Sequence, residues 1–241
     1  MSYSFTAASS QYLSASEAPL GSAPDRPWMV TAWARPTSIP LGASQHIALI
    51  GQSAANQYEG LSAFSDDFYA QSRDGSTNAP ANTSGAGLAS ATWAHGAARF
   101  DSATSRSAYV GTSQGTVVTT SVSPTGFDRV TVGCRPTITE YFDGLIAHVA
   151  FWTLDGMDET AIDNLVSALA GGGNPLGVTT DAVLLRYWPL VDNGDLADQS
   201  GNGGATLTAT GATHSSTNPT VDDPPSGGGS SYLNLTLMGV G

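Results

Sequence analysis

The chain has 241 residues, of which 40% are hydrophobic and 12% are charged, and its formal net charge is −12 at pH 7. This acidity disfavours nucleic acid as a partner, because the phosphate backbone is itself anionic. No apolar run is long enough to cross a membrane, so membrane insertion is not expected.

Reactive residue types are sparse in this sequence. All eight basic residues are Arg, which excludes lysine Schiff-base chemistry and a phosphate-binding loop lysine. Cys134 is the single cysteine, which excludes an intrachain disulfide and a cluster of thiolate ligands. We expect Cys134 to be buried and inert.

Short β-like runs separated by clusters of Gly, Ser, Pro and Asn predict the strands of a sandwich or barrel. The clearest predicted strands are residues 28–35, 46–50, 116–122, 129–132 and 145–152. Alternation along the first run places a Trp on each face, so we expect that strand to be covered on both sides. The long apolar run 145–152 is expected to be a central strand, and all five Trp residues are expected to lie in the core.

One helix is predicted, beginning after Asp158. Asp158 is a favourable N-cap and Glu159 follows it in the first turn. The apolar stripe of this helix consists of Ile162, Leu165, Val166 and Leu169. Gly171 to Gly173 and Pro175 end it, so the pattern predicts a single surface helix packed on the sandwich.

The C-terminal end has a different composition. Residues 224–231 are rich in Pro, Gly and Ser, which is typical of a linker. In residues 232–241, Leu233, Leu235 and Leu237 alternate with polar residues, which predicts a strand with one apolar face. This strand either folds back on its own sheet or docks on a partner by β-augmentation. The predicted organisation is therefore a sandwich over residues 1–223, a linker and a docking strand.

Several of these segments resemble laminin-G-like, concanavalin A-like lectin/glucanase domains. Residues 141–152 are similar to the family's "F-x-G-x-I-D-E-V-x-I-Y" strand, which is its most specific motif. Further similar segments are residues 28–36, 93–95, 106–111, the helix that begins at Asp158, and 185–190 together with 198–204. The resemblance implies an all-β fold, a jelly-roll of two antiparallel sheets. It implies little about activity, because the fold carries lectins, hydrolases, adhesion modules and virion proteins.

A glycosidase is the first enzyme class to test. Retaining glucanases of this family carry Glu-x-Asp-x-x-Glu on one strand, because period two turns alternate side chains to the same face. The chain has four Glu, at positions 17, 59, 140 and 159, and no two of its acidic residues lie two positions apart. We therefore predict a protein without enzymatic activity and keep a glycoside hydrolase as an alternative.

Residues 111–115 match the G-x-S-x-G pattern of a nucleophile elbow, with Ser113 as the serine. That elbow requires a helix after the serine. A predicted strand follows here instead, so the segment is interpreted as a hairpin turn.

An oxygen-rich loop contains Asp192, Asp195, Asp198 and Asn202. Such side chains suit Ca²⁺, although their spacing is not that of an EF-hand. In related domains the Asp of the "I-D-E-V" motif is often a calcium ligand, whereas Ala147 stands at that position here. The sequence therefore predicts no cofactor and a turn-forming role for the loop, with Ca²⁺ at Asp195, Asp198 and Asn202 as the alternative.

Glycan binding calls for an exposed aromatic side chain with polar groups beside it. The candidate carbohydrate-binding residues are Tyr58, Asp66, Asp67, Phe68 and Tyr69, with Asn56 and Arg73 near them in the sequence. The alternative is that Phe68 and Tyr69 occupy opposite faces of one strand, which would place one of them in the core.

These observations favour a structural or binding protein. We expect a phage virion surface component, either a capsid decoration protein or a tail-associated protein. Its expected partners are other virion proteins or copies of itself, reached through the C-terminal strand, with a cell-surface glycan as a further candidate. Residues 1–5 lack the pattern of a signal peptide. A secreted, stand-alone carbohydrate-binding lectin module is the alternative, and its location would be extracellular.

Overall fold

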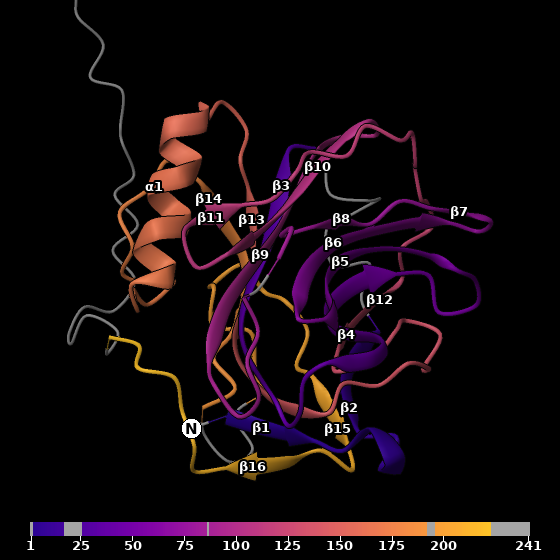
Figure 1. The fold of residues 1–241 in the computed structure, drawn as a ribbon. Coiled ribbons are helices and arrows are strands. Elements are labelled where there is room, and N and C mark those ends of the chain that lie inside the picture. Colours follow the sequence, from indigo (N-terminus) through magenta and orange to yellow (C-terminus); the bar gives the residue numbers. More distant parts are fainter. Residues whose placement is uncertain (1, 17–25, 86, 192–195, 223–241) are drawn as a thin grey trace, which may run out of the picture.

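The computed structural model describes residues 2–16, 26–85, 87–191 and 196–222. They form two β-sheets of eight strands each, packed face to face as a sandwich, with one α-helix against its side (Figure 1). Every pairing between the named strands is antiparallel. The expected all-β, jelly-roll-like sandwich is therefore confirmed.

The first sheet is built around the long apolar strand predicted to be central. It runs in the order β11 (Ser113–Gln114), β10 (Ser105–Val110), β9 (Ala94–Ser102), β3 (Trp28–Pro36), β13 (Gly144–Thr153), β1 (Ser2–Phe5) and β16 (Thr213–Ser215). Strand β14 (Val183–Trp188) also pairs with β13, alongside its second half. Strand β13 thus has three neighbours, which explains why nearly all of its residues are buried.

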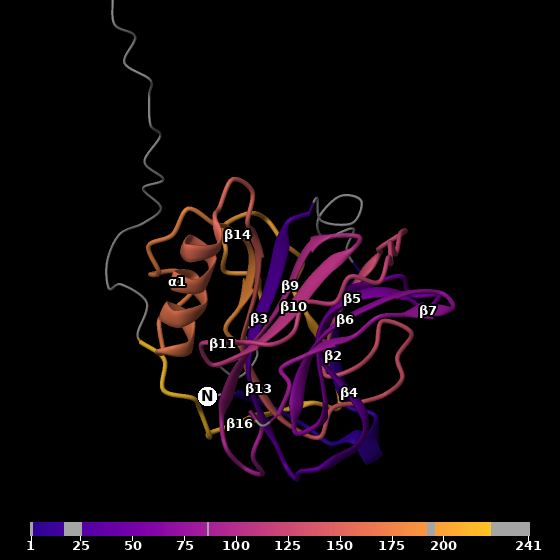
Figure 2. The ribbon, with the colours of Figure 1, turned by 45° about the horizontal axis from the view of Figure 1, so that its top comes forward.

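The second sheet forms the other layer of the sandwich. Figure 2 shows the whole molecule turned from the view of Figure 1. It runs in the order β15 (Thr208–Thr210), β2 (Tyr12–Ser16), β12 (Arg129–Val132), β4 (Leu41–Gly51), β5 (Gln57–Ser65), β6 (Asp67–Asp74) and β7 (Thr77–Asn78), and β8 (Ala81–Asn82) pairs with β6. A short 3₁₀ helix, η1 (Ala7–Ser9), connects β1 to β2 and so links the two sheets.

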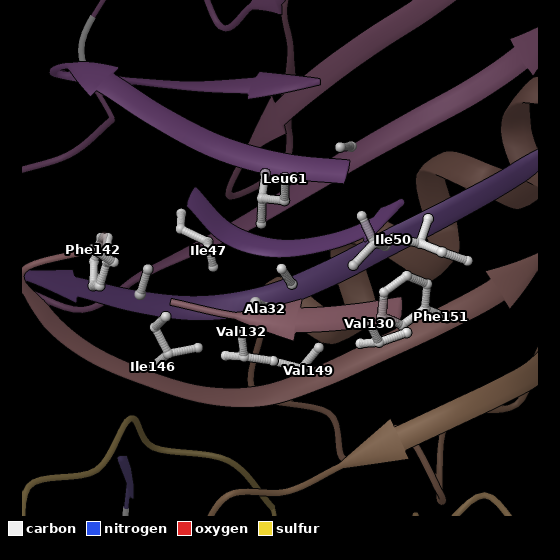
Figure 3. Close-up of a cluster of buried hydrophobic side chains, with 14 of the residues drawn as sticks. Ala32, Ile47, Ile50, Leu61, Val130, Val132, Phe142, Ile146, Val149 and Phe151 are labelled. Carbon is white, nitrogen blue, oxygen red and sulfur yellow. The ribbon is translucent and has the colours of Figure 1, made fainter. Parts of the chain in front are cut away.

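The main hydrophobic core lies between the sheets (Figure 3). Ala32 and Ile146 of the first sheet meet Leu61 and Val132 of the second. Trp28 stacks on Phe100, with 4.5 Å between the ring centroids. These side chains come from alternate positions of their strands, as the period-two pattern requires. Cys134 is buried, as expected.

The helix α1 (Glu159–Ala170) covers the outer face of the first sheet (Figure 1). The Asp158 carboxylate caps it by accepting a hydrogen bond from the Ala161 amide at 2.8 Å. The four residues of the predicted apolar stripe are buried against a second cluster that includes Met29, Ala97 and Trp152. No helix among the described residues has the length and apolarity that a membrane crossing requires.

Residues 116–122 do not form the predicted strand. They meet β10 at one isolated bridge, between Val118 and Arg106. The Arg106 guanidinium is fully buried and donates to the carbonyl oxygen of Thr120 at 2.8 Å. In a continuous strand the Thr120 carbonyl would accept a hydrogen bond from a backbone N–H, whereas here it accepts one from the Arg106 side chain. The prediction of a strand over residues 116–122 was therefore wrong.

Two of the five Trp residues also depart from expectation. Trp28, Trp152 and Trp188 are fully buried, whereas Trp33 and Trp93 are partly exposed. The linker 224–231 and the docking strand 232–241, including Leu233, Leu235 and Leu237, lie outside the described residues, and that part of the predicted organisation remains a prediction.

Candidate functional site

A pocket of about 320 Å³ opens on the outer face of the second sheet, the face turned away from the core. Its lining comes from four strands and two loops, and combines aromatic rings, amides and charged groups. The lining residues are Ser44, Tyr58, Phe64, Tyr69, Gln71, Arg73, Asn78, Pro80, Arg135 and Glu140.

Strand alternation explains one side of this lining. On β6 the outward residues Tyr69, Gln71 and Arg73 line the pocket, while Phe68 and Ala70, which alternate with them, are buried in the core. The antiparallel register with β5 places Tyr58 directly opposite Arg73. The alternation of side chains along β6 therefore places Tyr69, Gln71 and Arg73 in a row that faces the pocket.

Gly60, which lies two residues after Tyr58 on β5, is a point of close approach between β5 and β4. A Cβ at this position would come within 2.3 Å of the Ala48 carbonyl oxygen, and its φ is +151°. Both facts require glycine. A side chain at position 60 would also collide with the Leu49 side chain of β4, at 2.7 Å, so glycine lets β4 and β5 pack closely here.

One wall of the pocket is the loop between β12 and β13. Arg135 of this loop forms an ion pair with Glu140, and its guanidinium carbon lies 5.3 Å from the centroid of the Tyr58 ring. Tyr58 is almost fully buried beneath it. Burial raises the pKa of the Tyr58 hydroxyl, an effect that the guanidinium groups of Arg135 and Arg73 oppose. The arginine and the ring thus hold each other in place.

Glu140 is also connected to a buried histidine. Nε2 of His46 lies 2.9 Å from Oε2 of Glu140, and Nδ1 lies 2.7 Å from Oγ of Ser62. Burial lowers the pKa of His46, whereas the hydrogen bond from His46 lowers the pKa of Glu140. The ring is therefore neutral at pH 7, donates through Nε2–H to the carboxylate and accepts the Ser62 hydroxyl proton at Nδ1.

Ser62, His46 and Glu140 form a hydrogen-bonded series that resembles a hydrolytic triad. The serine, however, is not accessible to a substrate. Ser62 and His46 are both fully buried and neither lines the pocket. A nucleophile must reach the substrate carbonyl, and Ser62 cannot. The chain of hydrogen bonds instead fixes the position of the Glu140 side chain.

The opposite end of the pocket is aromatic. Phe64 is 42% exposed, and its ring meets that of Tyr69 edge to face, with 6.2 Å between the centroids. Beside them, the amide of Gln71 donates to the side chain of Asn78. The rings of Phe64 and Tyr69, the exposed amide of Asn78 and the largely buried amide of Gln71 can together contact a ligand with both apolar and hydroxyl-bearing faces.

Only two of the five candidate carbohydrate-binding residues line the pocket. Tyr58 and Tyr69 line the pocket, whereas Asp66, in the turn between β5 and β6, does not. Asp67 is buried and accepts hydrogen bonds from Thr83 Oγ1 and the Gly85 amide, at 2.8 and 3.0 Å. Phe68 is fully buried in the core, so its selection as a ligand contact was wrong; the alternative interpretation, with Phe68 and Tyr69 on opposite faces, is confirmed.

Most of the remaining lining residues are not among those predicted from the sequence. Gln71 carried a usable signal, since it shares the face of Tyr69 and Arg73 by period two. Phe64 could have been found in the same way from Tyr58 on β5. Arg135 and Glu140 belong to an irregular loop, and no periodicity in the sequence brings that loop to β5.

The oxygen-rich loop forms a hydrogen-bonded turn. The Asp198 carboxylate accepts from the amides of Tyr187, Ser200 and Gly204 at 2.8, 3.0 and 2.9 Å, and from Ser200 Oγ at 2.8 Å. The amide of Asn202 donates to the Leu184 carbonyl at 2.7 Å. Asp192 and Asp195 lie outside the described residues. Within the described ranges, no three His, Cys, Asp or Glu side chains gather as metal ligands.

The structure also shows where two features expected of an enzyme would lie, the G-x-S-x-G match and a pair of carboxylates. Ser113 opens β11, which pairs with β10 across a two-residue turn at Gly111, so the G-x-S-x-G match is the expected hairpin. A glycosidase needs two carboxyl groups on either side of the scissile bond. Glu140 is the one carboxylate among the described lining residues.

Comparisons with known proteins agree with this architecture. The sequence model of the family described as "Concanavalin A-like lectin/glucanases superfamily" matches residues 7–155. No curated protein matches the chain.

Among solved structures, the chain is similar to a native heptameric SAP-like pentraxin from Limulus polyphemus, with 15% identity and a TM-score of 0.52 over 70% of this chain and 81% of that one. Domains LG4-5 of the mouse laminin alpha1 chain share 14% identity, with a TM-score of 0.48 over 65% and 42%. The CBM40 of the Ruminococcus gnavus IT-sialidase, bound to alpha2,3 sialyllactose, shares 14%, with a TM-score of 0.45 over 60% and 83%. At 15% identity, the pentraxin shows the fold alone.

Proposed function

Since the chain belongs to the concanavalin A-like lectin/glucanases superfamily, we propose that it is a non-enzymatic carbohydrate-binding protein whose ligand occupies the pocket on the outer face of β4, β5 and β6. The observation that carries this proposal is the composition of the lining. Two ring-bearing side chains, Phe64 and Tyr69, stand beside the amides of Gln71 and Asn78. Sugars present an apolar C–H face and hydroxyl edges, which these two kinds of group match.

The pocket also has the rigidity that binding requires. Its floor is strand, and the Glu140 wall is fixed by Arg135 and His46. A preformed site spends little of its interaction energy on ordering itself. The absence of a second carboxylate from the described lining supports binding rather than bond cleavage.

The test is a glycan array probed with the wild type and the Tyr69→Ala variant. We expect the wild type to bind one class of glycan and the variant to bind it at least tenfold more weakly, because the ring that stacks on the sugar is gone. Tyr12→Ala is the matched control, since Tyr12 lies on the same sheet but outside the lining. Silence of the wild type, or equal loss in both variants, would contradict the proposal.

The hydrolase alternative is tested at Glu140. We expect no release of reducing ends from a panel of glucans by the wild type, and therefore no change in Glu140→Ala. Turnover that Glu140→Ala abolishes would favour the hydrolase.

At a finer level, we propose that the protein is a phage virion surface component that attaches through residues 232–241. Support comes from the sequence, where Leu233, Leu235 and Leu237 form one apolar face behind a Pro/Gly/Ser-rich segment. A strand of that kind is suited to adding to the edge of another protein's sheet. The alternative is a secreted lectin that works alone.

Attachment is tested by co-sedimentation with phage shells and by light scattering, with the full chain and a chain that ends at residue 223. We expect only the full chain to assemble or bind shells, with both chains showing the same circular dichroism spectrum. If both remain monomeric and free of shells, the virion role is wrong and the secreted lectin is favoured.

A further inference from the structure

The sign of charge in the pocket is opposite to that of the chain as a whole. The formal net charge of the chain is −12. The charged groups that line the pocket are the guanidinium groups of Arg73 and Arg135 and the carboxylate of Glu140. Glu140 stays ionised, since its hydrogen bond with His46 lowers its pKa. The pocket therefore carries one excess positive charge.

Arg73 supplies the excess positive charge of the pocket. Arg135 is paired with Glu140, so these two charges offset each other. Arg73 donates through Nε to the Gly75 carbonyl at 3.0 Å, and no ion pair joins it to any carboxylate in the described parts of the chain. The neighbouring carboxylate, Asp74, alternates to the other face of β6 and accepts from the Ser123 amide.

An arginine of this kind is a site for a carboxylate. A planar guanidinium can donate two parallel hydrogen bonds to a carboxylate, which gives both strength and orientation. Position favours the interaction as well, because Arg73 is only partly exposed in the lining of the pocket, where water screens charge less than at a fully exposed side chain.

We infer that the pocket takes a saccharide that carries a carboxylate, such as a sialic or uronic acid unit, with the carboxylate on Arg73. This inference rests on the proposed function and names its ligand class. Tyr69 precedes Arg73 by four residues on the same face of an extended strand, about 13 Å away. The charged unit thus binds at the Arg73 end and a neighbouring sugar packs on the ring of Tyr69.

Calorimetric titration with matched ligands tests this inference. The acidic probes are 3′-sialyllactose and trigalacturonate, and their neutral counterparts are the methyl esters of the same two saccharides. We expect at least one acid to bind tenfold or more tightly than its neutral counterpart, with the preference weakening as salt rises. The acid that binds identifies whether the unit is sialic or uronic.

The Arg73→Gln variant assigns the preference to its residue. It keeps a hydrogen-bond donor but removes the charge, so we expect it to bind the acid and its neutral counterpart equally. Arg35→Gln is the control, because Arg35 is a partly exposed arginine on β3, in the other sheet. Each variant is checked for wild-type thermal stability.

The outcomes separate this inference from the proposed function. Equal or tighter binding of the neutral saccharides overturns the acidic ligand and leaves carbohydrate binding standing. A preference for acids that survives Arg73→Gln overturns the assignment to Arg73. If none of the four saccharides binds and the glycan array is also silent, both the inference and the proposed function fail.

Discussion

Three buried histidines have pKa values below the ordinary 6.5, and burial is the first cause at each. The pKa of His95 falls to about 3 and that of His148 to about 4, while that of His46 is also lowered. His95 packs against the ring of Trp33, with 5.5 Å between the centroids. Nδ1 of His95 has no hydrogen-bond partner within the described ranges. The folded protein therefore keeps these rings neutral in mild acid.

This neutrality makes stability depend on pH. Below pH 6.5 the unfolded chain binds protons at these histidines while the folded chain does not, so stability is present above pH 6.5 and is lost as the pH falls towards 4. The loss is on the order of 3 kcal/mol for His95 or His148 at pH 4. Urea unfolding at pH 7.5, 6, 5 and 4 measures it. We expect His95→Asn to make the profile shallower, because His148 and His46 still contribute, with the partly exposed His214→Asn on β16 as the control substitution. A flat wild-type profile would contradict this account.

Asp198 stabilises the turn after β14. Its carboxylate is almost fully buried and accepts four hydrogen bonds. Asp198→Ala would leave buried amides without acceptors, and we expect it to lower the free energy of unfolding by about 3 kcal/mol. Urea denaturation measures this loss. Asp181→Ala, at an exposed position just before β14, is the control and should change stability by less than about 0.5 kcal/mol.

The hydrogen bonds to Asp198 also predict how the melting temperature responds to calcium. Because N–H and O–H donors already occupy the Asp198 oxygens, we expect the melting temperature to be the same in EDTA and in millimolar Ca²⁺. Differential scanning calorimetry measures it. A rise of several degrees with Ca²⁺ would restore the alternative interpretation of Asp198 and Asn202 as ligands.

At the scale of elements, α1 is anchored by packing and by one charge network. Leu165 is buried in the cluster that the helix shares with the first sheet. Arg99 of β9 reaches Glu159 at 2.7 Å and Asp101 at 2.6 Å. Glu159 is more than half exposed, so that contact contributes little beside apolar burial.

Leu165→Ala tests this ranking. We expect it to lower the free energy of unfolding by about 3 kcal/mol, because it leaves a cavity under the helix. Glu159→Gln should cost less than about 1 kcal/mol. Chemical denaturation compares the two, with exposed Ser167→Ala as the control. A larger cost for Glu159→Gln than for Leu165→Ala would reverse the ranking.

Strands and helix were predictable where one physical pattern dominates. The helix has a cap, a stripe and a glycine stop, and β3 and β13 have long apolar or alternating runs. Residues 116–122 failed because their β-branched composition describes a propensity, whereas pairing depends on a neighbour. The buried guanidinium of Arg106 decides that pairing, and no local pattern shows where it points.

At the scale of the whole molecule, only the smaller part of the site could be predicted from the sequence. Tyr58 and Tyr69 were predicted as exposed aromatic candidates and both line the pocket, although Tyr58 is almost fully buried. The alternation along β6 leads from Tyr69 to Arg73. Arg135 and Glu140 reach the pocket only because a loop 60 residues or more further along the chain folds over β5. Contacts at that separation depend on the packing of the entire sandwich, which local sequence patterns do not encode.

The central claim is that this sandwich holds a saccharide on the outer face of its second sheet without converting it. The most direct measurement is a nuclear magnetic resonance titration of the labelled protein with the tightest saccharide from the array, recording the spectra of both partners. We predict shifts confined to the strands and loops that line the pocket, namely β4 to β7, Pro80 and the loop that carries Arg135 and Glu140, with the saccharide signals unchanged after a day. Shifts centred elsewhere, or new signals from a cleaved sugar, would contradict the claim.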